Sequence, residues 1–308
     1  MSRALDEREM EALRREGSHH TRQRLTAQSA RFAGSWLEAI PSGKSKFTSP
    51  EWNILVRWWL GEDVYPKPHR CPKCNKTMDT QGYHALTCAK AGDRVHRHHN
   101  LCKTFTAIAT TATLNPKNER AIGGSKHRDA DVYVPVWEGS RPLAMDFAVT
   151  HTLQPSNSYQ SSFAEVRPAG TWAAEYAAAH KSAGRARCEK DGVRFAAMVV
   201  EVYGAWSPEA EDIIMKLARF AHLRSDKLEP VTVRSVFQQL SVSLALSTAR
   251  ALLSRADPML GENAEAGADV QSPASEGEGS DHDDSVGSDR EDVDVEETPR
   301  APERAVVV

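Results

Sequence analysis

Apolar side chains recur every three or four positions along much of the first 260 residues, which is typical of amphipathic helices. Ser49 and Pro50 mark one helix start, with Ser49 as the N-cap and Pro50 at the first helical position. Gly61 follows the last apolar residue of that helix and ends it. The predicted helices cover residues 3–40, 49–60, 93–113, 171–190, 208–223 and 231–255.

Alternation with period two predicts strands between these helices. Two such runs, 131–137 and 141–150, are separated by a short polar segment and form a predicted hairpin, and Phe195–Tyr203 is a third strand. The order helix, strands, helix, strand, helix indicates a mixed α/β (α+β) domain.

The hairpin register follows from its apolar faces, because a slip of one residue would expose them. The faces consist of Val132, Val134 and Val136 on the first strand and Leu143, Met145 and Phe147 on the second. They coincide when Val136 pairs with Leu143. Asp131 then lies opposite Ala148, and Asp146 becomes a diagonal neighbour of Asp131 on the other face, roughly 7–8 Å away.

Two neighbouring carboxylates suit Mg²⁺ or Mn²⁺, which take oxygen ligands. Phosphodiester hydrolysis uses such an ion to generate hydroxide and to offset charge that develops on phosphorus. A lysine is usually needed beside the ion, and Lys181 on the following predicted helix is the candidate, since the small Ala148 leaves room for it. The alternative is that Asp131 and Asp146 are two aspartates on the solvent-exposed face of a hairpin.

Four candidate metal ligands have the spacing C-x2-C-x9-H-x3-C, at Cys71, Cys74, His84 and Cys88. The first pair lets two thiolates face one ion, and His84 and Cys88 are one helical turn apart, so we predict a closed, structural Zn²⁺ site. A chance arrangement is the alternative. Other histidines lie nearby, at positions 69, 96, 98 and 99, whereas two further cysteines, at 102 and 188, lack partners at ligand spacing.

Composition and charge narrow the class of protein. The chain has 308 residues, of which 40% are hydrophobic and 26% charged, which excludes a fibrous or wholly disordered protein. Five cysteines argue against a disulfide framework. No apolar run approaches the ~20 residues of a membrane span, and the charged N-terminus lacks the apolar core of a secretory signal. We therefore expect a soluble intracellular protein with no membrane partner.

The net charge of −3 conceals an asymmetry. Residues 261–308 contain 15 acidic and 3 basic residues and predict a disordered tail, whereas residues 1–260 contain 36 basic and 27 acidic residues, a net charge of +9. A basic body suits a polyanionic partner such as nucleic acid.

Three features of the sequence resemble one family. They are the predicted zinc knuckle, which consists of Cys71, Cys74, His84 and Cys88 and contains the segment Gly82–Leu86; the Arg- and His-rich run 94–100; and Asp131 followed by Asp146–Thr150. It is the restriction-like endonuclease domain of site-specific non-LTR (LINE-type) retrotransposon polyproteins, and the resemblance covers roughly residues 30–255. It implies a PD-(D/E)xK core that nicks target DNA so that reverse transcription can be primed.

The resemblance also implies site residues. Asp131 and Asp146 become the two acidic ligands of Mg²⁺ or Mn²⁺. Weaker candidates for outer metal contacts are Glu119, before the hairpin, and Glu175 or Glu201, beyond it; the alternative for each is a buried-edge or surface salt-bridge role. Ala148 stands where the motif lysine would be, and Lys181 matches the displaced lysine known in this superfamily. The proline of the family signature is absent, since Asp129 and Ala130 precede Asp131.

These inferences divide the chain into a helical region (1–65), a zinc knuckle (66–92), a nuclease domain (93–258) and an acidic tail (259–308). The expected partner is nuclear DNA, with RNA of the parent element as the alternative. Because the chain is too short for a reverse transcriptase, we expect a stand-alone nuclease or a remnant of an element. A non-catalytic nucleic-acid-binding module and a zinc-stabilised protein-interaction domain are the competing functions.

Overall fold

The computed structural model describes residues 2–40, 42–43, 46–90, 92–122, 130–152 and 166–256, so the predicted acidic tail and Asp129 lie outside it. The described residues belong to one compact unit. Its elements are α1 (Ser2–Glu16), α2 (His19–Gln28), η1 (Ser35–Glu38), α3 (Ser49–Leu60), β1 (His69–Arg70), β2 (Thr77–Met78), α4 (Tyr83–Thr87), α5 (Asp93–Thr111), β3 (Lys117–Arg120), β4 (Ala130–Val134), η3 (Glu138–Ser140), β5 (Leu143–Thr150), α6 (Thr171–His180), α7 (Ser182–Lys190), β6 (Arg194–Glu201), α8 (Pro208–His222) and α9 (Glu229–Leu253). The prediction of a mixed α/β fold is confirmed.

Most predicted helices are present with shifted ends, but the single helix predicted over 3–40 is wrong: this segment contains α1, α2 and the short helix η1, and Ser18 starts α2 as its N-cap. The N-cap of α3 is Thr48 rather than Ser49, because Thr48 and Glu51 form a capping box in which each side chain accepts the other's backbone N–H. Gly61 ends this helix with a left-handed φ of 81°, as predicted. Ser207 caps α8 by accepting a hydrogen bond from the Ala210 N–H.

The prediction of a single helix over 171–190 is wrong, because the helix is interrupted between α6 and α7. Lys181 lies at this break, with φ −112° and ψ −1°, and is both the last cap of α6 and the first cap of α7. Helix propensity is high in the Ala-rich part and lower just after Lys181, where Ser182 and Gly184 follow.

The main sheet has the strand order β3-β4-β5-β6. The first two neighbouring pairs are antiparallel, and β5 and β6 are parallel. Strand β3 was not predicted, because all four of its residues are polar and exposed and therefore show no alternation.

The predicted hairpin register is wrong by two residues. Val134, not Val136, pairs with Leu143, and Val132 pairs with Met145. Strand β4 ends at Val134 because Pro135 has no N–H to donate to the ladder. Val136 is 58% exposed, whereas Val134 is fully buried. A shift of two residues keeps the apolar side chains of β4 and β5 on their predicted face, whereas the prediction that Val136 shares this face is wrong.

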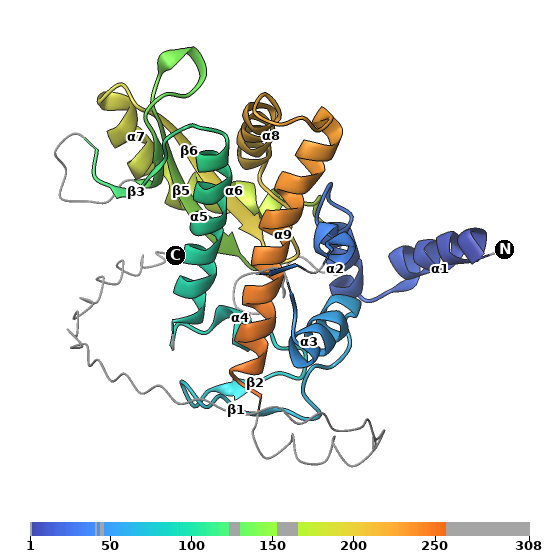
Figure 1. Cartoon of the computed structure of the whole chain (residues 1–308). Helices are drawn as coiled ribbons and strands as arrows, with labels where there is room; N and C mark the ends of the chain where they lie inside the picture. The colour runs from blue at the N-terminus through green and yellow to red at the C-terminus, as the bar shows by residue number, and fades with distance from the viewer. Residues whose placement is uncertain are drawn as a thin grey trace, which may run out of the picture. The chain divides into compact units, whose positions relative to one another are not determined.

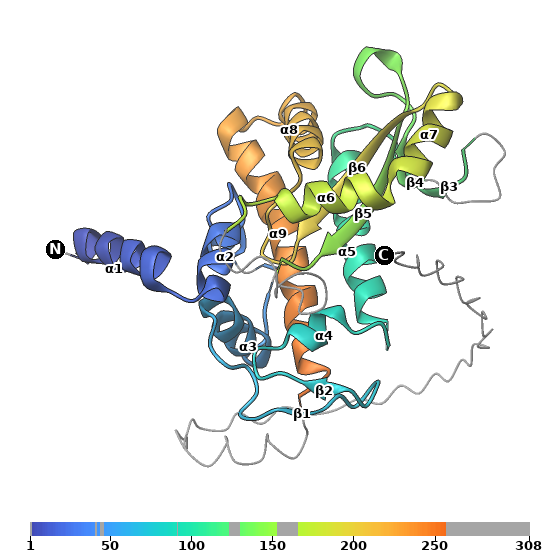
Figure 2. The ribbon, with the colours of Figure 1, turned by 180° about the vertical axis from the view of Figure 1, so that it is seen from behind.

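Helices cover both faces of this sheet. On one face, α5, α8 and α9 pack against the predicted apolar face of β4 and β5. On the other face, α6 and α7 pack on Tyr133, Ala144, Ala197 and Val199. Figure 1 shows α5 and α9 side by side, and Figure 2, seen from behind, shows α6 lying across the opposite face of the sheet.

Helix α9 extends beyond the sheet and contributes to two apolar clusters, the one on the sheet and a second one beside it. Its C-terminal half packs with α3, α4 and the β1–β2 hairpin in a second apolar cluster that includes Leu55, Trp58, Leu86 and Leu252. Trp58 stacks on Tyr203 with a ring-centre separation of 4.3 Å, so the tryptophan-rich helix is part of a core. Among the described helices, none has the length and apolarity that crossing a membrane requires.

The register correction has a measurable consequence. Val134→Ala should lower the free energy of unfolding by about 2 kcal/mol, because it removes two buried methyl groups and leaves a cavity. Val136→Ala should change it by less than about 0.5 kcal/mol, because that side chain is 58% exposed. Urea unfolding followed by circular dichroism measures both values. A larger loss for Val136→Ala than for Val134→Ala would contradict the register.

Candidate functional site

The strand register brings the two predicted carboxylates together. Continuing the register one position beyond the Val132–Met145 pair puts Asp131 opposite Asp146, and not diagonal to it as predicted. Directly opposed residues have Cβ atoms about 4.5–5.5 Å apart. Asp131 also accepts a hydrogen bond from the Phe147 N–H at 2.6 Å, which fixes its carboxylate against β5.

Lys181, between α6 and α7, is the third member of the predicted group. Its Nζ donates to Asp146 Oδ1 at 2.8 Å. The lysine side chain is 15% exposed and the aspartate side chain 28%, so this ion pair is largely shielded from water. Lys181 lies at the junction of α6 and α7. At the other end of α6, the N-cap Gly170 lies against the segment that follows β6, since a Cβ on it would be 2.5 Å from the Trp206 carbonyl oxygen.

A histidine also contacts this group. His98 on α5 lies with its Nε2 2.8 Å from Asp131 Oδ2. Cys102, one turn further along α5, lies with its Sγ 3.8 Å from the same nitrogen. Neither residue was predicted to join the carboxylates, although their i, i+4 spacing places them on one face of the helix.

The two carboxyl groups have different protonation equilibria. Burial raises the pKa of Asp146, the negative charge of Asp131 raises it further, and Lys181 only partly offsets this. Burial also acts to raise the pKa of Asp131, but the hydrogen bonds from His98 and the Phe147 N–H outweigh it and lower the pKa below its usual value. The hydrogen bond to Asp131 raises the pKa of His98. One negative charge is therefore most strongly fixed at Asp131.

Glu119 lies on β3, the strand beside β4. Continuing the register in which Asn118 pairs with Val132 puts Glu119 next to Asp131. Glu119 is exposed and has a left-handed φ of 49°, which interrupts the ladder at this point. Its role as an outer metal contact stays a prediction.

The predicted zinc ligands form one cluster. One donor atom each from Cys71, Cys74, His84 and Cys88 lies within 4.8 Å of the others. Cys74 Sγ is 3.1 Å from His84 Nε2. The nearby alternative His69 instead places its Nε2 2.9 Å from the Arg255 carbonyl oxygen. Three thiols and an imidazole form a closed tetrahedral set, so this cluster could hold a zinc ion.

Short backbone motifs build the knuckle. Cys71 and Cys74 lie in the turn between β1 and β2, and Cys71 N–H donates to the Lys76 carbonyl oxygen at 2.8 Å. His84 lies in the first turn of α4. Asp79 holds the N-terminus of this helix, because its carboxylate accepts hydrogen bonds from the N–H groups of Tyr83 and His84 at 2.8 and 2.9 Å. Both halves of the ligand set are therefore fixed by hydrogen bonds within the knuckle.

A buried arginine ties the knuckle to the helices. The Arg255 side chain is fully buried and forms an ion pair with Asp93 at 2.5 Å. It also donates to the Lys90 carbonyl oxygen at 3.1 Å. Because Asp93 is the first residue of α5, the arginine fixes the start of the helix that carries His98.

A further buried carboxylate lies at the end of β6. Glu201 is fully buried and accepts hydrogen bonds from the Thr152 hydroxyl at 3.1 Å and from the Trp172 N–H at 3.2 Å. It thus holds the N-terminus of α6, the helix that ends at Lys181. Burial raises the pKa of Glu201 to about 7, although these hydrogen bonds favour the charged form.

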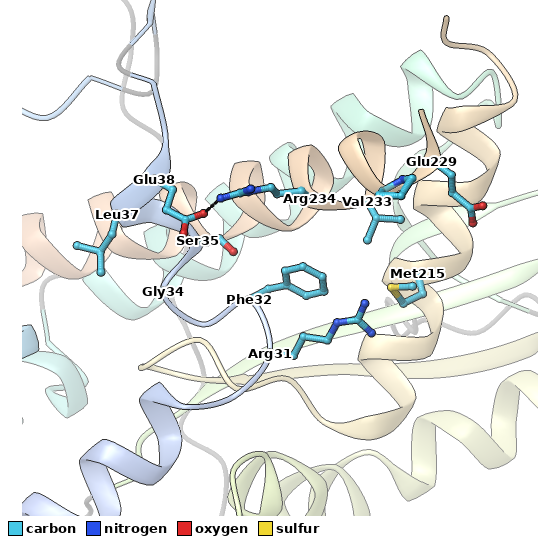
Figure 3. Close-up of a pocket in the computed structure, with 11 residues that line it drawn as sticks. Arg31, Phe32, Gly34, Ser35, Leu37, Glu38, Met215, Glu229, Val233 and Arg234 are labelled. Atoms are coloured by element: carbon cyan, nitrogen blue, oxygen red, sulfur yellow. Dashed lines mark hydrogen bonds and ion pairs between the residues drawn. The ribbon is translucent and has the colours of Figure 1, made fainter. Parts of the chain in front are cut away.

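A groove of about 760 Å³ lies elsewhere in the unit, between η1 and helices α8 and α9. Figure 3 shows Phe32, Arg31 and Met215 around it. Arg234 and Glu38 form an ion pair along its wall. The carboxylate group at Asp131 and Asp146 does not contribute to its lining, so groove and carboxylate site are separate.

The zinc cluster predicts a metal content. The purified protein should contain one zinc per chain by mass spectrometry of metals, and Cys74→Ser should reduce this value to near zero because a ligand is lost. Cys188→Ala is the matched control, since Cys188 lies in the α7 layer and not in the cluster. Full zinc occupancy in Cys74→Ser would contradict the assigned ligand set.

Glu201 predicts a pH dependence of stability. A pKa raised to about 7 in the folded state means that the wild type loses stability as the pH rises from about 4.5 to 7. Glu201→Gln lacks this loss. The stability of the variant relative to wild type should therefore rise by on the order of 3 kcal/mol between pH 4.5 and pH 8, measured by urea unfolding. Glu175→Gln, which replaces an exposed carboxylate of the same helix, should show no such trend. A constant difference between Glu201→Gln and wild type would refute the assignment.

Comparison with family models, curated proteins and solved structures finds no match to this chain. We therefore interpret both side-chain clusters from their own geometry and donor chemistry.

Proposed function

We propose that this protein is a metal-dependent endonuclease that nicks DNA, with a PD-(D/E)xK type of site. The observation that carries the proposal is the ion pair between Lys181 Nζ and Asp146 Oδ1 at 2.8 Å, beside the second carboxylate at Asp131. A lysine and two acids from separate helices and strands converge here. An exposed pair of aspartates on a hairpin would not require a shielded lysine.

The donor set fits a divalent cation. Asp131 and Asp146 present carboxylate oxygens from adjacent strands, and their side chains are 23% and 28% exposed, so an ion can reach them from solvent. Oxygen donors on a partly hydrated edge suit Mg²⁺ and Mn²⁺. When bound, such an ion would supply Lewis acidity toward a phosphate oxygen and a water with a lowered pKa.

The chain's own residues would then bind and orient the reacting groups. Lys181 offers a positive charge and N–H donors next to Asp146, where a phosphate oxygen or the attacking water can accept them. Hydrolysis forms a bond from the water oxygen to phosphorus, breaks the bond to the 3′ oxygen, and leaves a 3′ hydroxyl. The proton of the attacking water would pass to solvent or to a carboxylate near the ion, and the 3′ oxygen would take up a proton as it leaves.

Charge supports a nucleic-acid substrate. Residues 1–260 have a net charge of +9. Several exposed basic residues lie on α5 and β3, the elements next to the carboxylates: Arg94, Lys103, Lys117 and Arg120. Phosphate contacts of this kind give binding that weakens steeply with salt. Together with the knuckle, these features favour the nicking of nuclear target DNA in the manner of non-LTR retrotransposon endonucleases.

A plasmid assay tests the proposal. The protein should convert supercoiled plasmid into the nicked form in Mg²⁺ or Mn²⁺ and not in excess chelator. Asp131→Asn, Asp146→Asn and Lys181→Met should each reduce the rate by about two orders of magnitude or more, because each removes a group worth several kcal/mol in the transition state. Lys190→Met and Asp226→Asn, both exposed, are the matched controls and should leave the rate unchanged.

Two outcomes would overturn the proposal. Nicking that persists in both aspartate variants would mean that another site cuts the DNA. Salt-dependent DNA binding without cleavage in either metal would identify a non-catalytic nucleic-acid-binding module.

A further inference from the structure

A nitrogen donor is built into the carboxylate site by α5. His98 Nε2, Asp131 Oδ2 and Cys102 Sγ all lie within 4.8 Å of one another. The closest pair is His98 and Asp131, at 2.8 Å, and the imidazole is 27% exposed. Cys102 lies behind them and is 7% exposed. The three side chains therefore offer three different donor types at one point.

The spacing of the imidazole and the carboxylate suits two ligands of one ion. Neighbouring ligands of an octahedral ion with bonds of about 2.1 Å are about 3 Å apart. The Nε2 to Oδ2 distance of 2.8 Å is close to that value. A hydrogen bond has the same length, so metal affinity rather than distance separates the two roles.

We propose that His98 is a third ligand of the ion held by Asp131 and Asp146, and that it makes this site bind Mn²⁺ more tightly than Mg²⁺. The inference rests on the proposed metal site. Mg²⁺ is a hard cation that is held almost entirely by oxygen, whereas imidazole nitrogen is a good ligand for transition-metal ions. Replacing one oxygen ligand with nitrogen therefore shifts the preference toward Mn²⁺.

The fixed position of α5 supports this role. Arg255 holds Asp93 at the start of the helix, and His98 follows within two turns. Further along α5, Leu101 and Phe105 are fully buried against the sheet. The imidazole is thus presented to Asp131 by a helix that is fixed on both sides of it, which reduces the ordering cost of ligation.

Metal binding by the full chain tests the inference without measuring cleavage. Zinc-loaded protein is titrated with Mn²⁺, and free Mn²⁺ is followed by electron paramagnetic resonance; Mg²⁺ affinity is obtained by competition. The thiolate-rich knuckle keeps its zinc, because thiolates prefer Zn²⁺ to Mn²⁺. His98→Ala should raise the Mn²⁺ dissociation constant about tenfold or more and the Mg²⁺ constant less than about threefold. His99→Ala, which replaces the exposed neighbouring histidine, should change neither.

His98→Gln provides a second variant that keeps a polar group at this position, and circular dichroism and zinc content report whether each variant folds. It should retain Mg²⁺ binding while losing the preference for Mn²⁺. Equal losses for both ions would show that His98 only positions Asp131, and unchanged Mn²⁺ binding would show that it is no ligand; either result overturns the inference.

The same titration separates this inference from the proposed function. If Asp131→Asn leaves Mn²⁺ binding unchanged, the metal site itself is wrong and both fall. If Mn²⁺ binding requires both Asp131 and His98 but plasmid remains intact, the ligand assignment stands and the nuclease proposal falls.

Discussion

Two carboxylates on adjacent strands repel each other, and most of the surrounding polar structure offsets that repulsion. Unit charges about 5 Å apart repel by roughly 3 kcal/mol at an effective dielectric constant of about 20. Asp131 is stabilised by His98 and by the Phe147 N–H, and Asp146 by Lys181. His98 and Lys181 come from helix layers on different faces of the sheet. The arrangement of the two acids therefore depends on the sheet and on both layers.

Helix α5 connects the two side-chain clusters. It begins at Asp93, next to the knuckle and held by Arg255, and it presents His98 to Asp131 within two turns. At 1.5 Å of rise per residue, five residues span about 7.5 Å. Arg97, between them, is buried and donates to the Leu86 carbonyl oxygen at 2.9 Å, which adds another link to the knuckle. The two clusters are thus joined by a short helical segment that is hydrogen-bonded at both ends.

Local patterns predicted local features well. The knuckle ligands follow from spacing, because Cys71 and Cys74 share a turn and His84 and Cys88 a helical turn. The face on which Asp131 and Asp146 lie follows from alternation. The register did not, since a period of two cannot distinguish a shift of two residues, and the missing N–H of Pro135 decided it. The helix break at Lys181 was not predicted, because the only local signals are Ser182 and Gly184, which are weak against the Ala-rich sequence before them. The family, the metal and the reaction stay predictions.

Because Lys181 lies at a helix junction and not on a strand, the direction of its amine depends on the length of the preceding helix. Residues on a strand keep their direction when the chain is lengthened by two, but a helix rotates by about 100° for every residue. Inserting one residue into α6 would therefore turn the amine away from Asp146 while leaving every strand in place. Gly170 and Glu201 fix one end of α6. Its length of 10 residues therefore determines whether the Lys181 amine points toward Asp146.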